Sequence, residues 1–437
     1  MIPSTEDSRS NRSGASDGRN NAASTRELFC WALFDWANSA FPTVIQTFLF
    51  AAYFTRQVAA DTATGTAQWG NAISIAGLLV ALGGPVLGAV TDQTGRRKPW
   101  IAAFTAVCVA ATALLWFVEP STGFVWPALV LVGLGTVGVE YAVILYNAML
   151  PDLAGRDEVG RWSGWAWSLG YAGGLACLFV ALTVFVGMGD GELAGEEVPA
   201  GAVRNSVLLV AGWYLLFAVP MLLFTRDAPR TDKALGRAVR DAFGQLAESV
   251  RHVRRHRHVV RFLVARMLYI DGLATLFALG GVYAAGTFGM NERDILKFGI
   301  ALNVTAGLGA FGFGWVDDWI GGKRTIVLSL VGLIIPATAV LLVGDTTLSW
   351  VFCLIVGIFV GPVQAASRSF LSRVVPRELQ NQTFGLYALS GKATAFVGPL
   401  LVGWITYGTG SQRAGMSAIV VLFGLGLLLM VTVPRDE

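Results

Sequence analysis

The sequence is a succession of apolar stretches, most of them about as long as a helix that crosses a lipid bilayer. Spanning a hydrocarbon core of ~30 Å takes about 20 predominantly apolar residues in helical conformation. Charged residues make up only 14% of the 437 residues, whereas ordinary soluble domains carry about a quarter. A water-soluble fold of this length would lack the charged surface that it needs. The sequence therefore predicts an all-α membrane protein.

Twelve transmembrane helices can be placed on these stretches. Polar breaks separate them, and glycine and proline are frequent inside them, as is usual where helices pack in lipid. The predicted spans are 28–54, 68–91, 99–118, 124–149, 162–187, 206–225, 262–286, 296–316, 325–343, 348–370, 384–407 and 413–434.

The spans fall into two groups of six, separated by a long polar segment. We predict a disordered cytoplasmic tail at 1–26, a six-helix bundle at 27–225, a linker at 226–261, and a second six-helix bundle with a short tail at 262–437. The first 26 residues are polar and lack an apolar core, which excludes a cleaved signal peptide there. The linker has apolar residues near helical spacing among Arg and His, so we expect an amphipathic helix on the cytoplasmic membrane surface. Nucleic-acid binding by its basic run is disfavoured, because the net charge is only +3.

Basic residues concentrate in alternate loops, and this pattern predicts how the chain is oriented. With the amino terminus inside, the inner loops and the linker hold most of the Lys and Arg. Cytoplasmic loops of membrane proteins carry such an excess. We therefore expect a multi-pass protein of the cytoplasmic (inner) membrane with both termini in the cytoplasm.

The sequence shows no pattern typical of a catalytic or cofactor-binding site. The Gly-Lys pair in "YALSGKAT" lacks the spacing of a phosphate-binding loop, which argues against an ATP-driven pump. We find no nucleophile with a matching base, and expect no enzyme, no cofactor, no metal site and no nucleic-acid partner. The cysteines lie in apolar runs without a Cys-x-x-Cys pair; they are Cys30, Cys108, Cys177 and Cys353.

An internal repeat is the strongest indication of the architecture. Gly88–Lys98 reads GAVTDQTGRRK and Gly314–Arg324 reads GWVDDWIGGKR, so both fit G-x-x-x-D-x-x-G followed by basic residues. The second copy begins 226 residues after the first (314 against 88). Pro151 and Pro376 repeat with nearly the same offset, 225 residues (376 against 151). The chain is therefore predicted to be a duplicated six-helix unit, folded as two pseudo-symmetric six-helix bundles.

The repeated loop resembles the motif between the second and third helices of the major facilitator superfamily. The resemblance covers residues 27 to 434 and implies that superfamily's fold, with a substrate site between the halves near mid-membrane. It also implies that the motif latches one half to the other in one access state. The alternative is that these loops only set topology through their charge. The motif residues are Gly88, Asp92, Gly95, Arg96, Arg97, Lys98, Gly314, Asp318, Gly321, Lys323 and Arg324.

The motif also has a direct physical interpretation. Asp92 and Asp318 lie at helix ends, where a carboxylate can cap the positive N-terminus of a neighbouring helix. Small residues four apart allow helices to approach closely. Such pairs are Gly84 with Gly88, and Ala310 with Gly314.

A narrower resemblance is to the "unidentified major facilitator" family, relatives of the fungal autophagy-related vacuolar amino-acid effluxers. It is carried by "WALFDWANSAF", "YNAMLPDL", "SGWAWSLGYAGG", "GPVQAASRSFLSRVVP" and "FGLYALSGKATAFVGPL". The stretch "RELQNQTFG" departs from the acidic, Phe-rich pattern expected after "VP". The resemblance implies an amino-acid-like solute. "DQTGRRKPW" also resembles the corresponding loop of sugar–cation symporters, so sugar transport stays open.

Polar side chains recur inside the spans, where they usually face an aqueous pathway or one another. Asp35, Asn38 and Gln46 form one stripe of the first helix, and Asp271 occupies a comparable depth in the seventh. We take the following as candidates for the substrate and proton pathway: Asp35, Asn38, Gln46, Glu140, Asn147, Asp271, Gln364, Tyr387 and Lys392.

The roles of these residues stay open at this point. Asp35 and Glu140 could bind a proton, or each could be paired permanently with Arg266 or Lys392. Lys392 could meet a substrate carboxylate. Arg266 is expected to reach toward the cytoplasm, and Arg368 to act in gating or topology.

We predict a monomeric secondary transporter of a small, amino-acid-like polar solute that works by alternating access and is proton-linked. A sugar–cation symporter is the alternative. A non-transporting receptor or lipid-handling protein on the same fold is the alternative of another class.

Overall fold

The computed structural model describes residues 23–186, 198–229, 257–290, 292–376 and 379–434. All regular structure in these ranges is helical. The N-terminal half contains α1 (Thr25–Asn38), α2 (Phe50–Tyr53), α3 (Thr62–Thr94), α4 (Lys98–Leu114), α5 (Val125–Asn147), α6 (Leu150–Leu153), α7 (Val159–Ala181) and α8 (Ala200–Phe224). The C-terminal half contains α10 (Arg257–Phe288), α11 (Glu292–Ile320), α12 (Gly322–Leu342), α13 (Thr346–Val374), α14 (Gln380–Lys392), α15 (Val397–Thr409) and α16 (Gln412–Val431).

Eleven helical segments of the described chain are long and apolar enough to cross a membrane. The first predicted span, 28–54, is also helical, but two π-helical turns, Phe41–Phe48 and Phe54–Val58, interrupt it. Pro42 at the start of the first turn has no N–H to give to the preceding turn. The described chain therefore accounts for the twelve predicted crossings: eleven segments that are long and apolar enough, and a first crossing composed of shorter helical pieces.

Helix α1 begins earlier than the sequence analysis placed it, because Ser24 and Glu27 form a capping box. The Ser24 Oγ accepts the Glu27 N–H at 3.3 Å, and Glu27 Oε2 accepts the Ser24 N–H at 2.8 Å. Two orphan donors of the first turn are satisfied in this way. The predicted tail at 1–26 thus loses its last residues to the helix, and its residues 1–22 lie outside the described chain, as do residues 230–256 of the predicted linker.

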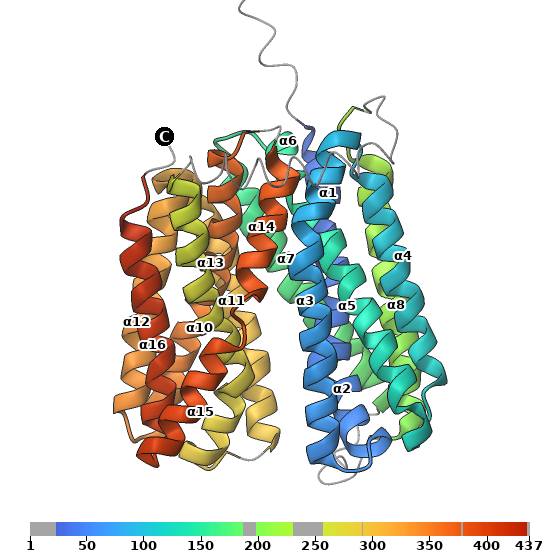
Figure 1. Ribbon diagram of the computed structural model, residues 1–437, viewed down its shortest axis with the longest axis vertical. Helices are drawn as coiled ribbons and strands as arrows, with labels where there is room; N and C mark the ends of the chain where they lie inside the picture. Colours follow the sequence, from blue (N-terminus) through green and yellow to red (C-terminus); the bar gives the residue numbers. More distant parts are fainter. Residues whose placement is uncertain (1–22, 187–197, 230–256, 291, 377–378, 435–437) are drawn as a thin grey trace, which may run out of the picture.

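The predicted span 384–407 is one crossing but two helices. The chain runs as α14 to Lys392, turns irregularly, and resumes as α15 at Val397. Pro399 lies in the first turn of α15, where its lack of an N–H is tolerated, and it cannot donate the hydrogen bond that would continue α14 through this point. Figure 1 shows α15 angled away from the axis of α14.

Each half packs around its own core. One cluster of buried side chains lies wholly between Leu28 and Met221. The other comes from residues 259–433, joined by Val80, Ile144 and Ala148 from the N-terminal half. The described chain starts and finishes at the same end of the molecule, which we call the terminal end, the opposite end being the far end (Figure 1). The halves meet where α3 packs on α14 and α7 packs on α11 and α13.

Candidate functional site between the two halves

At the terminal end, Asp92 of α3 caps the first turn of α14 in the other half. Its Oδ1 accepts the Asn381 N–H at 3.2 Å, and its Oδ2 accepts the Gln382 N–H at 3.0 Å. These donors belong to the helix start, where backbone N–H groups have no partner within the helix and carry partial positive charge. A carboxylate of one half therefore neutralises a helix terminus of the other.

The second copy of the motif repeats this arrangement in the opposite direction. Asp318 of α11 accepts the N–H groups of Gly160, at 2.7 Å, and Arg161, at 3.0 Å, at the start of α7. Arg373 of α13 donates to Asp317 at 2.5 Å and to Asp318 at 3.0 Å. The two caps are related by the duplication, and each joins one half to the other.

Glycines of the motif allow the halves to approach this closely. A Cβ on Gly88 would overlap the Asn381 carbonyl, and one on Gly314 would lie 3.0 Å from the Arg161 Cα. Gly95 and Gly321 end their helices with φ of 79° and 88°, a region that favours glycine. The motif's first glycine thus serves the interface and its last glycine serves the turn.

The basic residues of the motif have different positions. Arg97 donates through Nε to Asn381 Oδ1 at 2.5 Å, and also bonds Asp152. Lys98 donates to Thr225 O at 2.6 Å within its own half, and Lys323 to Val431 O at 2.9 Å. Arg96 and Arg324 are exposed. Of the first basic cluster, Arg97 bonds a residue of the other half. At the second cap Arg373 bonds Asp317 and Asp318, and the sequence pattern did not indicate a role for Asp317 or Arg373.

Arg368 of α13 inserts into the N-terminal half and is 2% exposed. Its Nη1 lies 3.1 Å from Asp35 Oδ2 and 3.0 Å from Asn147 Oδ1. Its Nε and Nη2 donate to the hydroxyl and carbonyl oxygens of Ser163, at 2.9 and 2.7 Å. The structure therefore pairs Asp35 with Arg368, whereas the sequence suggested Arg266 or Lys392 as its possible cation. Asn38, one turn from Asp35, donates its amide to Asp35 Oδ1 at 3.3 Å.

Aromatic rings surround the same guanidinium. Its Cζ lies 5.2 Å from the ring centroid of Trp31, 5.9 Å from that of Tyr146 and 5.8 Å from that of Trp167. Trp31 and Tyr146 are stacked with centroids 4.5 Å apart. A cation in such surroundings is stabilised by the ring quadrupoles as well as by its carboxylate.

A cavity of about 310 Å³ lies between the halves beside this pair. It brings together Glu140 and Asn147 of α5, Arg266 of α10, Gln364 and Arg368 of α13, and Tyr387 and Lys392 of α14. Lys392 Nζ bonds Glu140 Oε1 at 2.7 Å, so an ion pair bridges the halves at the cavity wall. Their side chains keep 36% and 30% exposure, against 2% and 12% for Arg368 and Asp35.

Arg266 is turned inward, contrary to the expectation that it reaches the cytoplasm. Its Nη1 donates to Tyr387 O at 2.6 Å and to Ser390 Oγ at 2.8 Å, and its Cζ lies 3.4 Å from the Tyr387 ring centroid. The carbonyl, hydroxyl and ring of α14 outweigh the gain from solvating the charge at the helix end. Gln364 donates to the Tyr171 hydroxyl at 3.1 Å across the interface.

Four of the predicted pathway residues do not line the cavity: Asp35 and Asn38 lie behind Arg368, and Gln46 and Asp271 lie elsewhere. Gln46 donates to Thr136 Oγ1 at 2.7 Å within the N-terminal half. Asp271 faces the start of α15 and accepts the Gly398 N–H at 3.1 Å. The predicted stripe Asp35–Asn38–Gln46 therefore does not line this cavity.

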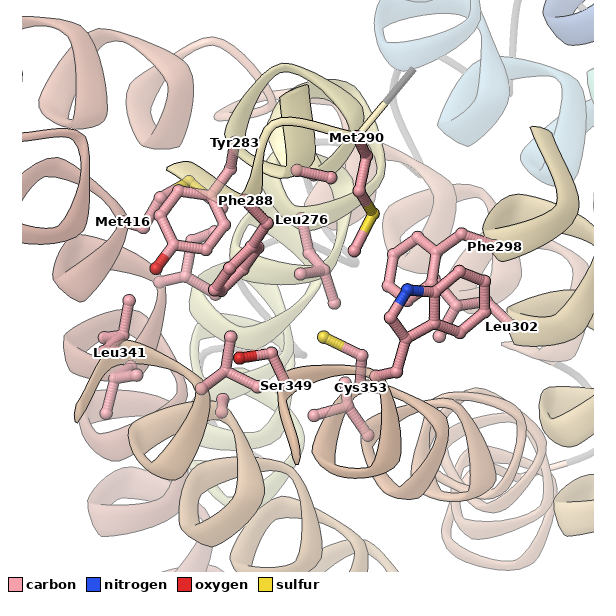
Figure 2. A pocket seen from close by; sticks show the side chains of 18 residues that line it. Leu276, Tyr283, Phe288, Met290, Phe298, Leu302, Leu341, Ser349, Cys353 and Met416 are labelled. Carbon is pink, nitrogen blue, oxygen red and sulfur yellow. The ribbon is translucent and has the colours of Figure 1, made fainter. Parts of the chain in front are cut away.

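A second cavity, of about 70 Å³, lies inside the C-terminal half toward the far end. Figure 2 shows Phe288, Met290, Phe298 and Cys353 around it. Its lining comes from one half, is almost wholly apolar and contains none of the predicted pathway residues. We assign it to packing.

Two bundles of six crossings that meet around a polar cavity, each with the glycine–aspartate motif at its interface, define a transporter of the major facilitator superfamily. Solved structures share this fold: the human organic anion transporter MFSD10 (TETRAN) has a TM-score of 0.74, with 15% identity over 93% of this chain and 99% of that chain. The proton:xylose symporter XylE has a TM-score of 0.70, with 15% identity over 94% of this chain and 96% of that chain.

The chain belongs to the "Vacuole effluxer Atg22 like" family, whose model matches residues 69–437. It is 28% identical to the uncharacterized MFS-type transporter YxiO of Bacillus subtilis, over 94% of this chain and 96% of the relative. It is 26% identical to Autophagy-related protein 22 of Kluyveromyces lactis, over 77% of this chain and 72% of the relative. The predicted fold class and family are confirmed.

Proposed function

We propose that this protein moves a small, amino-acid-like solute across the cytoplasmic membrane by alternating access, coupled to protons. The observation that carries the proposal is the cavity between the halves, whose wall holds Glu140 and Lys392 as a partly exposed ion pair. A zwitterion presents an ammonium and a carboxylate, and each can replace one member of that pair. The family of Atg22-like effluxers supports a solute transporter.

The charges of the cavity favour a zwitterion over an uncharged solute. Arg266 and Lys392 supply cations for a carboxylate, and Glu140 supplies the anion for an ammonium. Exchanging a protein ion pair for two protein–solute pairs keeps every charge compensated, which avoids the cost of an unpaired charge in a low-dielectric site. Gln364 and Asn147 add neutral hydrogen-bonding groups on either side.

The two caps and the Arg368–Asp35 pair are proposed to form the gate at the terminal end. All of them join one half to the other. In the oriented membrane that the loop charges predict, this end faces the cytoplasm. Opening toward the cytoplasm then requires both caps and the ion pair to separate, while the opposite state closes the far end. The cavity lies between halves of one chain, which supports a monomer as the working unit.

A solute-exchange assay on purified protein in liposomes tests the proposal. Vesicles loaded with unlabelled leucine should accumulate radiolabelled leucine by counterflow, and Lys392→Gln should reduce this at least tenfold. The matched control is Lys297→Gln, because Lys297 is an exposed cation on α11 paired with Asp294. Counterflow of a disaccharide instead of leucine would favour a sugar symporter. Movement of no solute from a broad panel would favour a receptor or lipid-handling protein.

A further inference from the structure

Asp271 stands out from Asp35 and Glu140, because it forms no ion pair in the part of the chain that the structure describes. It sits midway along α10 and is 3% exposed. Its Oδ2 accepts the Gly398 N–H at 3.1 Å, whereas its buried Oδ1 has no hydrogen-bond partner. Asp35 and Glu140, in contrast, are paired with Arg368 and Lys392. One oxygen of a buried carboxylate is therefore left unused.

The ionisable groups nearby are engaged elsewhere or lie toward helix ends. Arg266 and Tyr269 on α10 bond Tyr387 O and Ser367, respectively. None of the groups on the elements packed against α10 forms an ion pair or hydrogen bond with Asp271 in the described chain. These groups are Asp294, Lys297, Asp317 and Asp318 on α11, Arg368 and Arg373 on α13, Tyr387 and Lys392 on α14, Tyr407 on α15, and Arg413 on α16.

The Asp271 carboxylate lies at the start of the half-helix α15. Gly398 is in the first turn of α15, just after the break that separates it from α14. A Cβ on Gly398 would overlap the Thr275 hydroxyl, so α15 begins in direct contact with α10. Asp271 therefore supplies a charged cap to a helix terminus that the break at Pro399 leaves without an intrahelical partner.

We propose that Asp271 is the proton-binding site of this transporter, with the proton on Oδ1. This inference rests on the proposed proton-coupled transport. A buried carboxylate without a cation is costly as a charge, and a ligand that neutralises it is favoured. A metal cation needs several oxygen ligands. Here the Thr275 hydroxyl already donates to Asp271 O at 2.7 Å, and the carbonyls of Thr394 and Phe396 accept N–H groups of α15.

The position of Asp271 links the proton to the solute without placing both in one site. Its neighbours Ile270, Leu273 and Ala274 line the cavity, but Asp271 does not. Protonation removes the charged cap from α15, which frees the broken crossing to move relative to α10. The other half of that crossing is α14, which carries Lys392 at its end. A proton on Asp271 thereby acts on the helix that carries Lys392, the proposed partner of the solute carboxylate.

Infrared difference spectroscopy on the full-length protein in lipid tests this assignment without any solute. The wild type should show the C=O stretch of a buried carboxylic acid that disappears as the pH is raised. Asp271→Asn should lose this band, and Glu140→Gln and Asp35→Asn should keep it. Asn retains an oxygen for the Gly398 N–H, so the variant preserves the cap's hydrogen bond. A band that persists in Asp271→Asn, or that is absent from the wild type, overturns the proposal.

A second variant covers the case in which Asp271→Asn does not fold, judged by gel filtration. Asp271→Glu keeps the titrating group and should shift both the frequency and the midpoint of the band; an unchanged band overturns the assignment. A band that responds to sodium instead of pH also overturns it. Failure of the proton site can be told apart from failure of the proposed transport function. If no solute shows counterflow but the band belongs to Asp271, the proton site stands and the transport proposal falls. If leucine shows counterflow but the wild type has no such band, transport stands and the proton site falls.

Discussion

The guanidinium of Arg368 on α13 is bonded to the carboxylate of Asp35 on α1, 3.1 Å away across the boundary between the halves. Both groups are nearly inaccessible, and their bonds to Asn147, Ser163 and Asn38 use up most of the remaining donors and acceptors. A desolvated pair of this kind contributes little net stability when intact, but removing one partner leaves an uncompensated buried charge.

Replacing Arg368 by Met should therefore destabilise the closed protein by about 3–5 kcal/mol. Asp35→Asn together with Arg368→Met should recover a large part of that loss, because neither charge is left alone. Thermal unfolding of the two single variants and the double variant in one detergent gives the coupling energy. Arg324→Met, at an exposed cation on α12, is the control and should lie within about 0.5 kcal/mol of wild type. Strictly additive losses would contradict the pairing.

The caps at Asp92 and Asp318 should act as equivalent and independent parts of the gate. Asp92→Asn removes a charge at a helix start, worth about 0.3–1 kcal/mol and up to ~2 when partly buried. Each ~1 kcal/mol changes the balance between closed and open states about fivefold. The readout is the rate of maleimide labelling of a cysteine at Gln382, a 3% exposed interface position, with the native cysteines replaced by serine.

Labelling should rise in Asp92→Asn and in Asp318→Asn, and further in the double variant. Asp345→Asn is the matched control, since Asp345 caps its own helix at Leu348 N, away from the interface. Equal labelling in the wild-type background, the two single variants and the double variant would refute the role of the caps in holding the terminal end closed.

Gly88→Ala should open the terminal end, whereas Gly77→Ala on the same helix should not. A Cβ at Gly88 would overlap the Asn381 carbonyl, but nothing lies within 4 Å of one at Gly77. In the middle of a helix alanine is favoured over glycine by roughly 0.5–1 kcal/mol where the added Cβ meets nothing, so Gly77→Ala should be neutral or slightly stabilising. The same labelling assay distinguishes them. Similar behaviour of the two variants would show that the close approach of α3 and α14 is not required.

Lys392→Gln should leave stability almost unchanged, in contrast to Arg368→Met. Lys392 and Glu140 keep about a third of their side chains exposed at the cavity, and partly exposed pairs contribute about 0–1 kcal/mol. The variant should nevertheless lose the thermal stabilisation that a bound amino acid gives to the wild type. If Lys392→Gln lowers the melting temperature as much as Arg368→Met does, the Lys392–Glu140 pair stabilises the fold instead of binding solute.

Much of the fold follows from local sequence. The lengths of apolar runs, the repeated motif and its glycines determine the number of crossings and their grouping into two halves, because lipid forces each crossing to satisfy its own backbone. The caps at Asp92 and Asp318 could also be anticipated, since the motif places carboxylates at helix ends. The break in the crossing at 380–409 was not anticipated. Its signal, Gly398 followed by Pro399, was present but is common in membrane helices.

Which charges meet was decided by the tertiary structure alone. The sequence identified Asp35, Glu140 and Lys392 as ionisable groups inside the spans and offered Arg266 or Lys392 as partners of either carboxylate. Only the structure shows that Lys392 pairs with Glu140 and that Asp35 pairs with Arg368. Arg368, 333 residues from Asp35, reaches it only because the two halves close on each other. Asp271 looked equivalent to Asp35 by depth and repeat. The packing of α10 on α15 places the Gly398 N–H beside its carboxylate, where Asp35 has a cation. Such contacts depend on how whole helices pack against one another, and a local sequence pattern does not contain that information.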